Sequence, residues 1–417
     1  MHRFVYKSIK LNSTKALVAI LIGLIACSNF ALTSGEAAKP VDARLTAASS
    51  KFAFKLYGQL LKEHTAKNTF VSPASVMLAL AMTYNGADGE TRKAMARTLE
   101  IENMSLEEVN RAFANLKTTL TPTDAKVQLR IANSIWTRSG FRLNPAFVER
   151  NKQAYGAEIA SLDFSQPTAA ETINSWVSRN TEGKIDKIIA ADIDSDMMLF
   201  LINAIYFKAQ WKTEFKKEKT KPDTFKLGGD AQKQLPMMSQ SGTYFYYKGE
   251  NFQSVALPYG NGSVSMFIFL PNDGTALDQF ERNLTADNWD TWMKSFALTP
   301  GDVMLPRFKV QWESKLNESL KALGMAEAFS TNANFSQMAE VGPGRNLYIT
   351  EVRHKTWCEV NEEGTEAAAA TSVAVGVASV QEPREKFVMK VDHPFFFAIR
   401  DNQTGVVLFM GSVTDPG

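Results

Sequence analysis

Apolar and polar positions follow two different periods along the chain, and together they predict a mixture of helices and strands. From Ala48 onward, Phe52, Leu56 and Leu60 recur at the spacing of one helical face. Ser72 precedes Pro73, and a capping side chain followed by proline is typical of a helix start. Further helical periodicity covers 168–180 and 314–323.

Several stretches rich in β-branched and aromatic residues predict strands. The last two, 395–399 and 406–410, flank a polar segment ending in Gly405 that predicts a hairpin turn. No internal repeat is present, and the mixture is neither a regular βαβ alternation nor all-β. The sequence therefore predicts an α+β fold. The other predicted strands are 127–136, 198–207, 263–270 and 302–310.

The N-terminal residues 1–26 have the pattern of an export signal. A short apolar run at 16–26, interrupted by Gly23, follows a basic segment without acidic residues. The basic residues of that segment are Arg3, Lys7, Lys10 and Lys15.

The end of this run, Leu24-Ile25-Ala26-Cys27, resembles a bacterial lipobox and predicts lipid attachment to Cys27. The alternative is ordinary signal cleavage near Ala31 or Ala37. Residues 27–47 are small and polar, so we expect a flexible tether there. The protein would then be extracellular or periplasmic, and attached to a bacterial membrane if Cys27 is acylated.

Composition excludes several classes of function. A net charge of +2 gives no electrostatic basis for binding nucleic acid. The sequence has no paired cysteines, no His-x-x-x-His and no glycine-rich phosphate loop, so we expect neither a metal nor a cofactor. Of the two cysteines, Cys358 follows Trp357 in an alternating stretch, and we expect it to be buried.

A collinear series of motifs links the chain to a known family. The motifs include Asn68-Thr69-Phe70-Val71-Ser72-Pro73, Leu201-Ile202-Asn203-Ala204, Leu305-Pro306-Arg307-Phe308, Glu362-Glu363-Gly364-Thr365 and His393-Pro394-Phe395. On these residues the chain resembles the serpin family from about Ala48 to Pro416. The resemblance implies one domain over 48–417, with a helical lobe, large mixed β-sheets and an exposed reactive loop at about 362–385.

The resemblance also implies a function. Serpins are metastable inhibitors of serine proteases, not enzymes; a protease cuts the reactive loop once, and the loop then inserts into a sheet. We expect a monomer whose partners are serine proteases. A non-inhibitory serpin, acting as a carrier or chaperone, is the alternative.

The segment that would insert has the composition of a strand to be buried. Val373, Val375 and Val377 alternate with small residues, although the alanines before them favour a short helix by propensity. Non-inhibitory members tend to carry bulky or charged residues in this hinge. Here the hinge consists of Glu362, Gly364, Thr365, Ala367, Ala368, Ala369, Ala370 and Thr371.

The cleaved bond is placed by counting. Inhibitory members usually have seventeen residues from the hinge glutamate to the residue before the bond, and from Glu362 this count gives Ala378–Ser379. A small residue there predicts an elastase-like or subtilisin-like protease. Lesser candidates are Val377, Val380 and Arg384, the last implying a trypsin-like target.

The remaining site residues are also implied by the resemblance. Ser72, Ser75, Asn203 and His354 match the shutter, a polar cluster beneath the place where the sheet opens. We expect a buried hydrogen-bond network there and no hydrolase chemistry, since no Gly-x-Ser-x-Gly motif is present. Residues matching the region where the loop first enters, the breach, are Trp211, Glu362 and Lys309.

Overall fold

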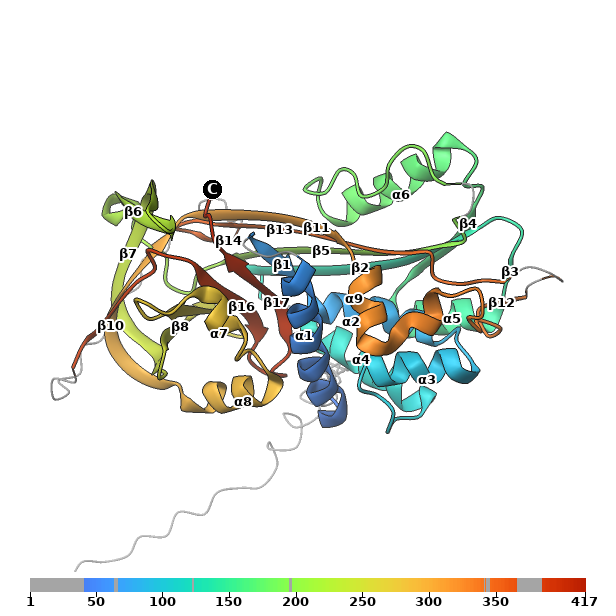
Figure 1. The fold of residues 1–417 in the computed structure, drawn as a ribbon, viewed down its shortest axis with the longest axis horizontal. Helices are drawn as coiled ribbons and strands as arrows, with labels where there is room; N and C mark the ends of the chain where they lie inside the picture. Colours follow the sequence, from blue (N-terminus) through green and yellow to red (C-terminus); the bar gives the residue numbers. More distant parts are fainter. Residues whose placement is uncertain are drawn as a thin grey trace, which may run out of the picture. The chain divides into compact units, whose positions relative to one another are not determined.

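The computed structural model describes residues 41–63, 67–121, 124–194, 197–340, 342, 346–365 and 385–417. In these ranges two large mixed β-sheets are flanked by helices (Figure 1). The prediction of an α+β fold is therefore confirmed.

A six-stranded sheet carries the features on which the function depends. Its order is β11-β13-β14-β5-β2-β4, and β13 also pairs directly with β5. The β13–β5 and β2–β4 pairs are parallel, and the other neighbours are antiparallel. The strands are β2 (Val127–Arg138), β4 (Glu158–Leu162), β5 (Leu199–Gln210), β11 (Phe308–Lys315), β13 (Glu351–Val360) and β14 (Gly364–Thr365).

Helices cover both faces of this sheet. Every residue of α2 (Pro73–Tyr84) is buried, as expected for a helix that is apolar all round. The predicted cap at Ser72 is confirmed, because its Oγ accepts the N–H of Ser75 at 3.3 Å. On the other face, α6 (Pro167–Asn180) packs its apolar side on β2 and β5 (Figure 1). Coverage on both sides explains why β5 is buried over most of its length.

A nine-stranded sheet forms the second layer. Its order is β1-β17-β16-β9-β8-β7-β10-β15, with β6 beside β7. The predicted hairpin is confirmed, since β16 and β17 pair antiparallel. The strands are β1 (Thr69–Val71), β6 (Lys221–Gly228), β7 (Ala231–Lys248), β8 (Phe252–Tyr259), β9 (Val264–Pro271), β10 (Ala297–Pro306), β15 (Phe387–Lys390), β16 (Phe395–Asp401) and β17 (Val407–Val413).

The first helix begins earlier than the pattern predicted. Helix α1 (Ala43–Glu63) starts five residues before Ala48, inside the segment expected to be a tether. Leu45 is fully buried and extends the apolar face by one turn, which accounts for the earlier start. The other elements are α3 (Gly89–Thr98), α4 (Leu106–Leu120), α5 (Pro145–Tyr155), α7 (Leu277–Glu281), α8 (Ala286–Ser295), α9 (Asn317–Leu320) and the strand pair β3 (Arg142–Leu143) with β12 (Ala339–Glu340).

Two predicted elements were wrong in extent. The run 302–310 is two strands in different sheets, β10 and β11, separated at Arg307. Its apolar pattern continues through the break because both strands bury side chains. The helix predicted over 314–323 is shorter: β11 continues to Lys315, and α9 passes into a π turn in which Gly324 has φ +107°.

Residues Pro40–Gly417 cluster into one compact unit. No helix in the described part of the chain is long and apolar enough to cross a membrane.

Candidate functional site between β5 and β13

The short strand β14 lies between the ends of two parallel strands, β13 and β5. Over five residue pairs, from Glu351–Phe200 to Lys355–Ala204, β13 and β5 pair directly. Beyond those pairs Thr365 lies between them, paired with Val360 of β13 and with Ala209 of β5. The two strands are therefore already separated at one end by a segment antiparallel to both.

The turn into β14 requires glycine. Gly364 has φ +149°, and a Cβ at this position would lie 2.0 Å from the carbonyl oxygen of Ala209. The side chain of Asn361 closes the turn by accepting the N–H groups of Glu363 at 3.0 Å and Gly364 at 3.3 Å. The close backbone approach follows from the absence of a side chain at 364.

The two glutamates before β14 are held by ion pairs. Arg307 donates to both oxygens of Glu362, at 2.7 and 3.0 Å, and Thr220 donates at 2.6 Å. Burial acts to raise the pKa of Glu362, but these bonds outweigh it and leave the pKa below its ordinary value. Glu363 pairs with Lys217 at 2.6 Å. The start of the hinge is thus anchored in the body of the protein.

Trp211 lies directly beneath this turn. Its ring stacks on that of Tyr259 with centroids 4.4 Å apart, and its Nε1 donates to the carbonyl of Asn361 at 2.9 Å. The hydroxyl of Tyr259 is 2.7 Å from Oγ1 of Thr365. Thr365 is 1% exposed, so the residue expected to lead insertion is already buried in this state. Of the predicted breach residues, Lys309 lies further out, on β11, with Nζ 5.5 Å from the Trp357 ring.

The four predicted shutter residues meet in one buried cluster. The backbone N–H of Ser72 donates to Nε2 of His354 at 3.0 Å, and its Oγ donates to the carbonyl of Leu408 at 2.6 Å. Nδ2 of Asn203 donates to Oγ of Ser75. His354 and Asn203 are also paired neighbours across β13 and β5. The cluster therefore lies on the line along which the sheet would divide.

This geometry excludes a catalytic serine–histidine pair at the cluster. Nε2 of His354 accepts from a backbone N–H, so it holds no serine proton, and the neutral ring carries its own proton on Nδ1. Burial lowers the pKa of His354 to about 3. No metal-binding group of three or more His, Cys, Asp or Glu side chains occurs among the described residues.

Two polar atoms in the cluster lack a partner among the described residues. They are Nδ1 of His354, a donor, and Oδ1 of Asn203, an acceptor. A buried donor or acceptor without a partner costs about 1–3 kcal/mol. A group that enters between these two strands could accept a hydrogen bond from Nδ1 and donate one to Oδ1.

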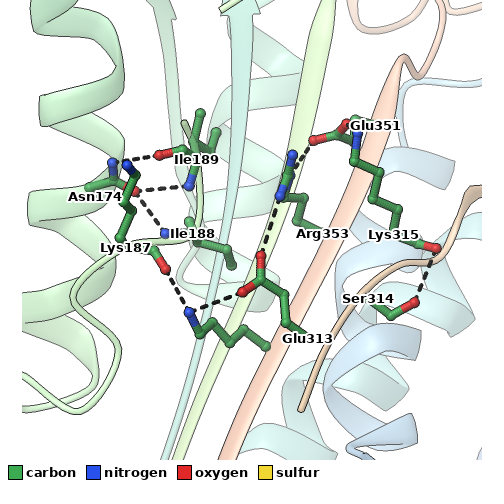
Figure 2. A network of polar contacts seen from close by, with 10 residues as sticks. Asn174, Lys187, Ile188, Ile189, Glu313, Ser314, Lys315, Glu351 and Arg353 are labelled. Carbon is green, nitrogen blue, oxygen red and sulfur yellow. Dashed lines mark hydrogen bonds and ion pairs between the residues drawn. The ribbon is translucent and has the colours of Figure 1, made fainter. Parts of the chain in front are cut away.

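A polar network that the sequence analysis did not predict links the segment that follows α6 to β13 (Figure 2). Nζ of Lys355, on β13, donates to the carbonyl of Lys187 at 2.9 Å and pairs with Glu313 at 3.0 Å. Nζ of Lys184 lies 4.7 Å from the ring centre of Trp357, also on β13. Because the segment's own apolar residues pack on β2 and β5, these contacts join the two sides of the sheet.

The described residues do not include every predicted site residue. Cys358 is buried as expected. The export signal 1–26 and the cleaved bond lie outside the described residues. The predicted site residues that lie outside are Cys27, Ala367, Ala368, Ala369, Ala370, Thr371, Ala378 and Ser379.

Comparisons with known proteins show which family the chain is similar to. A family model described as "Serpin (serine protease inhibitor)" matches residues 47–416. The chain is 36% identical over 384 residues to the leukocyte elastase inhibitor of Sus scrofa and 35% identical over 384 residues to that of Homo sapiens. Both alignments cover 89% of this chain and 100% of the relative.

Solved structures have the same fold. The native state of tengpin, a thermophilic serpin, matches with a TM-score of 0.83 and 33% identity, covering 90% of this chain and 95% of that one. Human thyroxine-binding globulin matches with a TM-score of 0.81 and 27% identity, covering 90% of this chain and 99% of that one.

Proposed function

The chain belongs to the serpin family, and on that premise we propose that it inhibits a serine protease by being cut once and trapping the enzyme. The observation that carries this proposal is β14, which has already entered between β13 and β5. Continued entry of the same segment after cleavage would complete a strand between them.

The register defines which residues would follow. Gly364 pairs with Gln210 and Thr365 with Ala209, so the two numbers of each pair add to 574. Extending this antiparallel register places residue 371 opposite Asn203 and residue 375 opposite Leu199, where β5 begins. Residues 366–375 are therefore the right length to run along the whole of β5.

The side chains of this segment suit burial on the face that points toward Tyr259. Positions that share a face with Thr365 carry Ala367, Ala369 and Thr371, followed by two valines. Glu366 is the one charged residue of 366–375, and it falls on the opposite face. Entry of the strand would thus bury no charge on the Tyr259 side, where an unpaired charge costs several kcal/mol.

Thr371 could supply a hydrogen-bond partner to both of these shutter atoms. In the extended register it lies between Asn203 and His354, which are themselves paired neighbours. A threonine hydroxyl can accept from Nδ1–H of His354 and donate to Oδ1 of Asn203. We infer that insertion supplies partners to two buried atoms that have none among the described residues.

The chemistry belongs to the protease. Its serine oxygen attacks the carbonyl of Ala378, the amine of Ser379 leaves with a proton, and an ester joins the inhibitor to the enzyme. Insertion carries the attached protease away before water hydrolyses that ester. The small side chain of Ala378 and the inhibitory relatives named for leukocyte elastase favour an elastase-like or subtilisin-like target.

The test is incubation with an elastase-type, a subtilisin-type and a trypsin-type protease, followed by a denaturing gel. We expect a covalent complex with the first two, and a released C-terminal peptide that begins at Ser379 by mass spectrometry. A peptide beginning at Glu385 would move the cleaved bond to Arg384 and the target to trypsin-like enzymes.

A carrier is the second candidate, because one structural relative is thyroxine-binding globulin. The small hinge residues argue against it. Cleavage by every protease without a covalent complex would support the carrier and contradict the inhibitor.

We further propose that the inhibitor acts as a monomer outside the cytoplasm, anchored through acyl chains on Cys27. One acyl chain gives only marginal binding, so stable anchoring needs two or more. In a bacterial host, the wild type should label with a fatty-acid analogue and sediment with membranes, and Cys27→Ala should do neither. Soluble, unlabelled behaviour of both proteins would instead support ordinary cleavage near Ala31 or Ala37.

A further inference from the structure

A cavity of about 930 Å³ lies between α1 and α7 (Figure 1). Cavities that hold small molecules usually measure about 300–1,000 Å³ and are mostly apolar, with a few polar groups that orient the ligand. The apolar part of this wall comes from both helices and from segments distant in the sequence, so a ligand that fits it is largely apolar. The apolar side chains are Phe54, Leu61, Leu277, Leu284, Leu323 and Pro394.

A glycine keeps one wall of the cavity open. Gly58 lies inside α1, where glycine is less favourable to the helix than alanine. Its φ is not positive, so the backbone does not require glycine there. A Cβ at this position would have no atom within 4 Å, so no neighbour excludes a larger residue either. The effect of the glycine is therefore to leave space in the cavity.

The buried acid of the wall is engaged by the protein's own hydroxyl groups. Oε1 of Glu281 accepts hydrogen bonds from Oγ of Ser412 and from the hydroxyl of Tyr57, the latter at 3.2 Å. Burial raises the pKa of Glu281 above its ordinary value, because the surroundings disfavour the charged carboxylate. A cationic ligand would thus find an acid whose charge is disfavoured and whose Oε1 is already occupied.

The exposed charges of the wall favour an anion instead. Lys62 and Lys67 line the cavity, are exposed, and have no acidic partner among the described residues. Nζ of Lys62 donates to the neutral side chain of Gln59 at 3.3 Å. The other lysine and the arginine of the wall, Lys55 and Arg282, already have acidic partners. Two unpaired cations beside an apolar cavity attract a negatively charged head group.

We propose that this cavity binds a fatty acid, with the acyl chain against the apolar wall and the carboxylate at Lys62 and Lys67. The ligand combines the two properties that the wall selects, a long apolar body and a single negative charge at one end. None of the breach or shutter residues and no residue of β14 lines the cavity. Binding therefore does not depend on cleavage of the reactive loop, nor on the protein being a protease inhibitor.

The experiment is isothermal titration calorimetry of the full chain with octanoate, decanoate and dodecanoate. Each added methylene that is buried should strengthen binding about 4-fold. Decanol and decylammonium carry the same chain as decanoate with a neutral or positive head group. Decanoate should bind about 3- to 30-fold more tightly than decanol, and Lys62→Ser/Lys67→Ser should remove this preference. Lys51→Ser, an exposed lysine of α1 outside the cavity wall, is the matched control.

Filling the cavity from α1 tests its location. Gly58→Trp places a large side chain in the open space and should weaken decanoate binding more than about 10-fold. Gly58→Ala adds one methyl group that meets no atom within 4 Å, and should keep wild-type affinity. A guanidinium unfolding transition like that of the wild type shows that the tryptophan variant is folded. If it is not, the lysine double variant decides the proposal.

Four results would overturn the proposal. The first is an affinity that does not rise from octanoate to dodecanoate. The second is wild-type affinity in a folded Gly58→Trp protein, which would place the ligand elsewhere. The third is an unchanged preference for decanoate over decanol in the lysine double variant. The fourth is tighter binding of decylammonium than of decanoate, lost in Glu281→Gln, which would assign the cavity to an amine.

Discussion

Replacing Thr371 with valine tests the insertion register most directly. Valine keeps the size and β-branching of threonine and removes only the hydroxyl. In the uncleaved protein, Asn203 and His354 pair directly across β5 and β13, so no inserted side chain lies between them. In the cleaved protein, residue 371 would lie between them. The substitution should therefore destabilise the cleaved form alone.

The magnitude follows from the two unpaired atoms. Oδ1 of Asn203 and Nδ1 of His354 are buried, and both would lose the partner that Thr371 supplies. Leaving such an atom unpaired costs about 1–3 kcal/mol. We expect the free energy of unfolding of the cleaved form to fall by about 2 kcal/mol or more.

The assay is guanidinium unfolding of cleaved and uncleaved protein, each as wild type, Thr371→Val and Thr371→Ser. Serine retains the hydroxyl and should keep most of the wild-type stability in the cleaved form. The unfolding midpoint of the uncleaved form should be the same in all three proteins.

Equal stability of the cleaved wild type and the cleaved valine variant would refute the register. An equal loss in the cleaved and uncleaved forms would also refute it, because residue 371 would then contribute before insertion.

Three further predictions concern described residues. Thr365→Arg should convert the inhibitor into a substrate, because Thr365 is already buried beside Tyr259 and an arginine there must leave the sheet or bury an unpaired charge; a gel showing wild-type yields of complex would contradict this. Gly364→Ala should also lower the yield of complex, since its Cβ would meet the Ala209 carbonyl at 2.0 Å, whereas Gly58→Ala on α1, with nothing within 4 Å, should not. Between about pH 6.5 and 3, His354 is charged in the unfolded chain but neutral in the folded protein, so the free energy of unfolding falls as the pH is lowered, by about 2 kcal/mol from pH 7 to pH 5; urea unfolding at pH 7 and pH 5 should show a smaller drop in His354→Asn than in the wild type, and an identical drop would disprove the assignment.

The sequence predicted most of the elements because their signals are local. Helix α2 has its cap, its proline and its apolar residues within one short stretch. The strand pattern that gave β2, β5 and β9 is equally local. The break at Arg307 was missed because apolar alternation continues from β10 into β11, although the two strands belong to different sheets.

The site was predicted only as far as family motifs reach. Trp211 and the shutter residues came from the resemblance, and no spacing in the sequence would bring Asn203 next to His354. The contacts of Lys355 with Lys187 and Glu313 join residues far apart along the chain, and each residue alone resembles an ordinary surface charge. That Thr365 is already inside the sheet is a property of three strands together, which periodicity along one strand does not encode.

One buried thiol provides a natural probe of how often the six-stranded sheet opens. Cys358 lies on β13, in register with Val310 of β11, and is 1% exposed. If the chain is exported as proposed and Cys27 is removed or acylated, Cys358 is the one thiol left in its sequence. A buried thiol reacts with a reagent only during local opening. The labelling rate of Cys358 in the unmutated protein would therefore report how often the sheet opens locally without cleavage. That rate bears on how long a stored molecule keeps its uncleaved conformation.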